Sequence, residues 1–247
     1  SIEKEDIKYV FLHEKITPEC IKTDNEFLCR GKIKNEVLWI EDEIKKAITD
    51  DRIMIYLQPI YSNTKKKFVS AEVLARIRRE DGSLLMPSTF IPIAEQSGLI
   101  RDLEDVIIRK TCEFIYKYDL RTLGLDYVEV NLSVKNGEKT DFAKKCKTMI
   151  AEYRIDPSLV NFEITETAVL SEKSRLLENM NQMIEHGFRF SLDDFGSGES
   201  NLNYIIDMPI TIIKFDKTLT DAYKCNDKAK AVIKSYSSTS LSSSLSR

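Results

Sequence analysis

Segments with the spacing of strands and of helices follow one another along most of this chain of 247 residues. Short runs rich in β-branched and aromatic residues alternate with longer stretches whose apolar side chains recur every three to four positions. Six strands are expected, at residues 53–60, 68–76, 127–133, 159–166, 188–194 and 211–216. Helices are expected near residues 39–48, 88–98, 101–118, 142–150, 176–187, 202–206 and 217–234. This alternation predicts an α/β fold with a parallel sheet and right-handed helical crossovers. A TIM-like (β/α) barrel fits best, although only six of its eight strands are evident.

Three regions of the chain differ in pattern. Residues 1–38, which contain Pro18 and Gly31, are interpreted as a linker or the remnant of a preceding domain. Residues 39–234 carry the alternation and are expected to form the barrel. Residues 235–247 contain eight serines and are expected to be a flexible tail.

Composition excludes several classes of function. With 37 Lys and Arg against 40 Asp and Glu, the net charge is −3, which argues against polymeric nucleic acid as a partner. No apolar run approaches the roughly 18 residues that cross a bilayer, so no membrane segment is expected. The five cysteines are scattered without a CxxC pair, which is typical of free thiols in a cytoplasmic protein. With only two histidines, a Ser-His-Asp triad and a His-rich zinc site are disfavoured, so any metal is expected to be held by oxygen.

Polar residues interrupt the apolar strands near their C-terminal ends. In a barrel these ends form one rim, where active sites lie. Carboxylates that meet there repel one another, so they take up protons or bind cations, and oxygen ligands favour Mg²⁺ or Mn²⁺ over zinc. A single such carboxylate is more often solvated or a helix cap, so the prediction of a metal site depends on the whole set. The set is Glu72, Asn131, Glu163, Asp193, Asp194 and Lys214.

A pair of such cations suits a phosphodiester substrate. Two ions a few ångströms apart would hold a bridging hydroxide and clamp the phosphate for in-line displacement. Arg76, four residues after Glu72, offers a fork for a phosphate oxygen. Lys214 is expected to orient the attacking water or to stabilise the developing charge.

Seven motifs then follow in a recognisable order. They are YLQPI (56–60), EVLARI (72–77), FIPIAEQSGLI (90–100), VNLS (130–133), FEITE (162–166), DDFGSG (193–198) and MPITIIKFD (208–216). Over roughly residues 39–234 the sequence resembles the EAL-domain family of bacterial cyclic di-GMP phosphodiesterases.

The resemblance implies a TIM-like barrel that hydrolyses cyclic di-GMP to linear pGpG with Mg²⁺ or Mn²⁺, in a two-metal site. It implies metal ligation by Glu72, Asn131, Glu163 and Asp193, with Asp194 as a further ligand or a partner of the metal-bound water. It gives catalytic roles to Lys214, Asp194 and Glu166, of which Glu166 would brace the loop after the fourth strand. It implies that Gln58 and Arg76 contact the guanine and phosphate of the substrate.

The end of the chain departs from the family pattern. After about Ile233 the sequence has no counterpart of a seventh strand with an EGVE-like motif or of an eighth with a QGY-like motif. The first and sixth strands are therefore expected to be exposed edges. Truncation or a frame change is the expected reason, and we expect this chain to have low or no turnover.

Two other functions stay open at this point. The chain could hold cyclic di-GMP without cleaving it and signal to a partner. It could also act as a dimerising platform, since exposed edges favour pairing, and a homodimer is the expected assembly.

Overall fold

The computed structural model describes residues 26–165, 174–196, 208–227 and 230–231. The chain divides into two compact units, residues 1–39 and 40–247. The division of residues 1–38, 39–234 and 235–247 into linker, barrel and tail stays a prediction. No helix in the described part of the chain is both long and apolar enough to cross a membrane.

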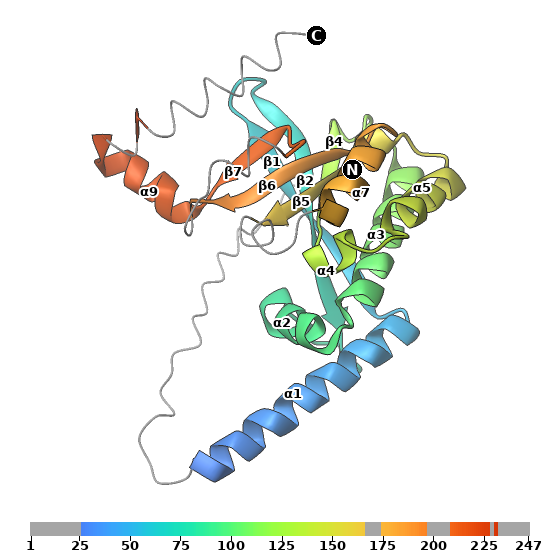
Figure 1. Ribbon diagram of the computed structural model, residues 1–247, viewed down its shortest axis with the longest axis vertical. Coiled ribbons are helices and arrows are strands. Elements are labelled where there is room, and N and C mark those ends of the chain that lie inside the picture. The colour runs from blue at the N-terminus through green and yellow to red at the C-terminus, as the bar shows by residue number, and fades with distance from the viewer. Residues whose placement is uncertain (1–25, 166–173, 197–207, 228–229, 232–247) are drawn as a thin grey trace. The chain divides into compact units, whose positions relative to one another are not determined.

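One sheet organises the second unit (Figure 1). Its strands are β1 (Ile53–Ser62), β2 (Lys67–Arg78), β3 (Leu84–Leu85), β4 (Tyr127–Asn131), β5 (Val160–Thr165), β6 (Arg189–Phe195) and β7 (Ile212–Phe215). They lie in the order β1-β2-β4-β5-β6-β7, with β3 beside β2. From β2 to β7 all neighbours along this path are parallel, so the six predicted strands and the α/β class are confirmed.

The first strand does not follow the predicted parallel arrangement. β1 runs antiparallel to β2, because only residues 63–66 connect the two strands. A parallel pair needs a crossover of about a dozen residues, whereas a short turn closes a hairpin. Within the described residues, β1 and β7 each pair with a single strand and form the two ends of the sheet.

Helices follow most of the strands. They are α1 (Glu26–Thr49), α2 (Pro87–Ser97), α3 (Ile100–Tyr118), α4 (Val134–Gly137), α5 (Phe142–Tyr153), α7 (Ser174–Ile184) and α9 (Lys217–Cys225), with a 3₁₀ turn at Pro157–Leu159. α1 begins at Glu26 rather than at residue 39, since Gly31 costs a helix only about 1 kcal/mol and no proline stands between residues 26 and 49. The helix expected at 202–206 lies outside the described residues.

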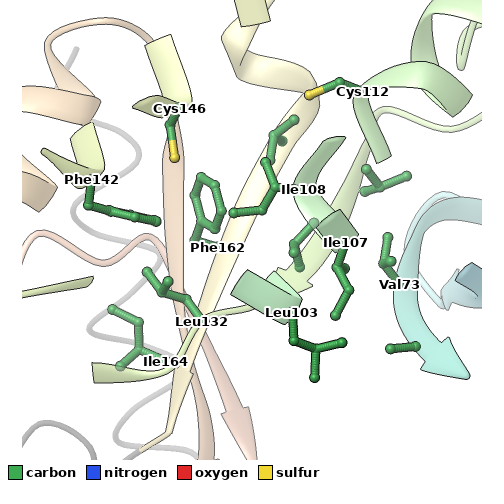
Figure 2. Close-up of a cluster of buried hydrophobic side chains, with 14 of the residues drawn as sticks. Val73, Leu103, Ile107, Ile108, Cys112, Leu132, Phe142, Cys146, Phe162 and Ile164 are labelled. Atoms are coloured by element: carbon green, nitrogen blue, oxygen red, sulfur yellow. The ribbon is translucent and has the colours of Figure 1, made fainter. Parts of the chain in front are cut away.

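The core lies between the sheet and its covering helices. Val73 of β2 lies beside Ile107 of α3, and Phe162 of β5 lies beside Ile108 of the same helix, as Figure 2 shows. Along β2 the residues 71, 73, 75 and 77 are buried in this core, while Glu72 and Arg76 alternate with them and point to the opposite face. Because one face of the sheet packs on helices, the polar residues of the strands gather on the other face.

Candidate active site

The register of the parallel strands brings the predicted polar residues together. Glu72 of β2 pairs with Glu129 of β4, and Asn131 of β4 pairs with Glu163 of β5. Residues paired across neighbouring strands project from the same face, as do residues two apart along one strand. These side chains therefore share the face of the sheet that turns away from the helices.

The sequence pattern placed Glu72 near the C-terminal end of its strand, and the structure corrects this prediction. Glu72 lies near the middle of β2, but β2 pairs with β4 only over Ser70–Val73. Beyond Val73, β2 continues against β1 and β3. Glu72 is thus at the C-terminal end of the parallel part of the sheet, which is why it still reaches the other site residues.

Glu72 and Asn131 form one contact of the site. The Asn131 Nδ2 donates a hydrogen bond of 3.1 Å to Glu72 Oε1. Burial raises the pKa of Glu72, and the negative charges of Asp193 and Glu129 raise it further. Lys214 and the Asn131 amide only partly oppose this effect. A carboxyl in these surroundings gains from a nearby cation, since a positive charge would offset both burial and repulsion.

Lys214 of β7 joins two buried carboxylates from β4 and β5. Its Nζ lies 2.8 Å from Glu129 Oε2 and donates a hydrogen bond to Glu163 Oε1. Burial raises the pKa of Glu163, and the Glu129 carboxyl beside it acts in the same direction. Burial disfavours the charged ammonium, but its two carboxylate partners outweigh burial and raise the pKa of Lys214.

Asp193 and Asp194 lie near the C-terminal end of β6, at an irregularity of the sheet. The pairing of β6 with β7 shifts register between Leu192 and Phe195. Asp194 has φ 54°, in the left-handed region that costs an ordinary residue roughly 1–2 kcal/mol. Burial and the neighbouring Asp193 raise the pKa of Asp194. The strained turn separates the two adjacent carboxylates, of which Asp193 is half-buried and Asp194 is exposed.

The two residues predicted to touch substrate lie on the β1–β2 hairpin, which also carries Glu72. Gln58 of β1 is exposed and stands opposite Glu72 in the hairpin. The Arg76 guanidinium lies 5.5 Å from the centre of the Tyr56 ring and donates a 2.7 Å hydrogen bond to the Ala75 carbonyl. Burial lowers the pKa of Arg76. Among the described residues, the guanidinium of Arg76 therefore has only one hydrogen-bond acceptor, the Ala75 carbonyl.

A cavity of about 790 Å³ opens beside this group. Asn131 and Glu163 belong to its lining, together with apolar side chains of α2 and α3 such as Ile91 and Ile107. Its size is within the range of small-molecule sites.

Glu129 is a site residue that the sequence pattern did not single out. It is 2% exposed and pairs with Lys214 across the face of the sheet. A signal was present, because Glu129 stands two positions before Asn131 in YVEVN and a strand repeats every two residues. Glu166, by contrast, lies outside the described residues, as do Ser197 and Gly198 of the DDFGSG motif.

The oxygen donors of this face fit a divalent cation. The Glu163 Oε2 atom is buried and has no hydrogen-bond donor among the described residues. Carboxylate and amide oxygens are ligands that Mg²⁺ and Mn²⁺ accept. In the described part of the chain no three Asp, Glu, His or Cys side chains already meet as a ready metal group. The donors meet in pairs instead, with the Lys214 ammonium between Glu129 and Glu163.

Comparison with known proteins identifies a matching family model and similar relatives. A family model described as EAL domain matches residues 41–244. The signaling protein YkoW of Bacillus subtilis (strain 168) is 32% identical over 189 residues, which are 76% of this chain and 24% of the relative. The probable cyclic di-GMP phosphodiesterase PdeB of Escherichia coli (strain K12) is 33% identical over 190 residues, or 77% of this chain and 36% of the relative. The chain therefore spans only about a quarter to a third of the length of these relatives.

Solved structures show the same architecture. The cGMP-bound form of the EAL enzyme Bd1971 matches with a TM-score of 0.75 and 24% identity, covering 87% of this chain and 60% of that one. The FimX EAL domain of Xanthomonas citri, in complex with c-diGMP, matches with a TM-score of 0.74 and 14% identity, covering 85% of this chain and 81% of that one. The prediction of a TIM-like barrel of this type is thereby confirmed.

Proposed function

Because the chain belongs to the EAL domain family, we propose that it hydrolyses cyclic di-GMP to linear pGpG with the help of divalent cations. One observation carries this proposal. Glu72, Asn131, Glu163 and Lys214 project from four strands of one sheet and contact one another on one face, as a hydrogen-bonded pair and an ion pair. The reaction adds one water: a bond forms between the water oxygen and phosphorus, the bond from phosphorus to a ribose 3′-oxygen breaks, and that oxygen gains a proton.

The oxygen ligands proposed for the cations are Glu72, Asn131, Glu163, Asp193 and Asp194. Bound Mg²⁺ or Mn²⁺ would polarise the phosphate and neutralise its charge at this otherwise acidic face. Asn131 holds the Glu72 carboxylate in place through its 3.1 Å hydrogen bond. Asp194 lies directly beside Asp193 at the point where the pairing of β6 with β7 shifts register, which supports a shared role for the two carboxylates. Glu166 keeps its proposed role as the brace of the following loop.

The remaining roles concern water and substrate. Lys214 is proposed to orient the attacking water through its ammonium, which reaches the centre of the carboxylate group. Arg76 is proposed to bind a phosphate oxygen, since within the described residues its guanidinium donates only to the Ala75 carbonyl, and Gln58 is proposed to present its exposed amide to the guanine.

The activity is tested by incubating the chain with cyclic di-GMP and Mn²⁺ and separating the nucleotides by chromatography. Linear pGpG is expected to accumulate slowly with Mn²⁺, because low turnover is expected of this chain, and not at all with EDTA. Glu72→Gln keeps the size of the side chain but removes a charged ligand, so the rate is expected to fall at least 100-fold. Glu113→Gln is the matched control: Glu113 is an exposed carboxylate of α3 that accepts a 2.9 Å hydrogen bond from Tyr153, and its loss is expected to leave the rate unchanged.

Two outcomes would count against hydrolysis. Calorimetric binding of cyclic di-GMP without any product would select a non-catalytic ligand-binding module instead. A chain that neither binds nor cleaves the nucleotide would remove both functions and leave a dimerising platform.

The proposal extends to assembly and location. A homodimer is supported by the exposed aromatic side chains of the β1–β2 hairpin, namely Tyr56, Tyr61 and Phe68. Sedimentation that stays monomeric at high protein concentration would contradict it. A cytoplasmic location is supported by the buried, unpaired thiols of Cys112 and Cys146, which suit a reducing compartment.

A further inference from the structure

Lys214 has two carboxylate partners, and the cation site proposed above accounts for only one of them. Glu163 is counted among the metal ligands, yet one of its oxygens accepts a hydrogen bond from Lys214. Glu129, which pairs with the same ammonium at 2.8 Å, has no part in metal ligation. A second carboxylate buried beside this lysine needs a physical reason, since burying a charge is costly unless it is paired.

Glu129 is fixed from two sides. Its Oε1 accepts a 3.3 Å hydrogen bond from Ser70 Oγ of β2, and its Oε2 faces Lys214 of β7. The side chain of Glu129 is 3% exposed, that of Glu163 is 0% exposed and that of Lys214 is 23% exposed. Glu129 therefore forms a buried anchor on one side of the ammonium, with Glu163 on the other side.

A lysine with Glu163 alone would compete directly with a bound cation. Lys214 and the cation would then need the same carboxylate, and a buried ammonium deprived of its partner is strongly destabilised. With Glu129 in place, the ammonium keeps a partner when Glu163 turns toward a cation.

We propose that Glu129 is a positioning residue that retains the Lys214 ammonium and so leaves Glu163 available to ligate the cation. This inference rests on the proposed metal-dependent function. Glu129 acts through Lys214 and Glu163 and does not itself touch the cation or the substrate.

The inference is tested by measuring Mn²⁺ affinity directly, by calorimetry on the full chain without nucleotide. Glu129→Gln is expected to weaken Mn²⁺ binding about tenfold, because Lys214 then keeps Glu163. Ser70→Ala removes the hydrogen bond to Glu129 and keeps its charge, so it is expected to weaken binding two- to threefold. It serves as the test if Glu129→Gln does not fold. Glu43→Gln is the matched control, since it removes one carboxylate from the buried pair of Glu43 with Arg52 at 2.5 Å, and Mn²⁺ affinity is expected to stay within twofold.

A double-mutant cycle separates this role from a general effect of charge. Lys214→Met is expected to raise Mn²⁺ affinity about tenfold in the Glu129→Gln background, but by no more than about twofold in the unsubstituted chain. If Lys214→Met raised Mn²⁺ affinity equally in the two backgrounds, Glu129 would act only through its negative charge, and the proposal would be overturned. An unchanged Mn²⁺ affinity in Glu129→Gln would also overturn the proposal. If Glu129→Gln does not fold, an unchanged affinity in Ser70→Ala would do the same.

Turnover of cyclic di-GMP provides a second readout. Glu129→Gln, assayed at saturating Mn²⁺, is expected to lower kcat about tenfold, because Lys214 is displaced, while KM changes less than threefold. A change confined to KM would assign Glu129 to substrate binding and contradict the positioning role. If the unsubstituted chain binds Mn²⁺ and shows the expected cycle but no hydrolysis, the proposed function fails while this inference stands. If it binds no Mn²⁺, both fail.

Discussion

Phe162 lies at the centre of a group of packed aromatic rings. It is fully buried on β5 and contacts three other rings, with the centroid of Phe142 at 5.9 Å, that of Phe188 at 5.9 Å and that of Phe190 at 5.7 Å. Phe162→Ala is expected to lower the free energy of unfolding by about 3–5 kcal/mol, since the cavity cannot close around three rigid rings. Urea unfolding followed by circular dichroism measures the change. Tyr116→Ala, at a side chain that is 68% exposed, is expected to change it by less than about 0.5 kcal/mol, and equal losses in the two variants would contradict this packing argument.

At the scale of elements, one carboxyl ties helix α3 to the loop that follows Asn131. Glu104 is 5% exposed and accepts hydrogen bonds from the Ser133 backbone N–H at 2.8 Å and from its hydroxyl at 3.1 Å. Burial nevertheless dominates and raises the pKa of Glu104 to about 7. The folded state therefore binds a proton more tightly than the unfolded state does, and the resulting stabilisation is present at low pH and is lost as pH rises through about 7.

Glu104→Gln is neutral at every pH and is expected to remove this dependence. Between pH 5 and 8 the stability of the variant relative to the unsubstituted chain is expected to rise by up to about 3 kcal/mol. Chemical unfolding at a series of pH values measures the difference, and Glu113→Gln, at an exposed carboxylate of the same helix, is expected to show none. Parallel stability curves for Glu104→Gln and the unsubstituted chain would contradict the assignment.

At the scale of the whole molecule, cation binding is expected to stabilise the fold, because the proposed ligands come from separate strands that only the folded chain brings together. At an Mn²⁺ concentration 100 times the dissociation constant the gain is about 2.7 kcal/mol, which raises Tm by roughly 5–10 °C for a domain of this size. Asn131→Ala is expected to abolish the shift, and EDTA to reverse it. In Glu43→Gln the Tm is expected to be lower both with and without Mn²⁺, while the increase in Tm on adding Mn²⁺ persists. If Mn²⁺ still raises the Tm of Asn131→Ala, the cation binds elsewhere.

The sequence predicted the elements better than it predicted their pairing. Each of the six strands was located because apolar β-branched residues mark it locally. The direction of β1 was wrong because strand spacing carries no direction, and only the short connection at residues 63–66 excludes a crossover. The start of α1 was wrong because Gly31 was given the weight of a helix end, although one glycine within a helix is tolerated.

The candidate site shows the same limit. Glu72, Asn131, Glu163 and Lys214 were identified because polar residues within apolar strands are conspicuous, and the structure brings them together. Glu129 was overlooked because it precedes the end of its strand, and its importance depends on Lys214, which is 85 positions away along the chain.

The sequence by itself determined the alternation of strands and helices, the oxygen-rich chemistry of the strand residues and the absence of histidine-based alternatives, since all of these depend on residue type and local spacing. Only the tertiary structure decided the register that sets Glu72 beside Glu129 and the position of Lys214 between two carboxylates. Those features arise from contacts between segments far apart along the chain, where burial and charge act over a few ångströms in space and local spacing carries no record of them.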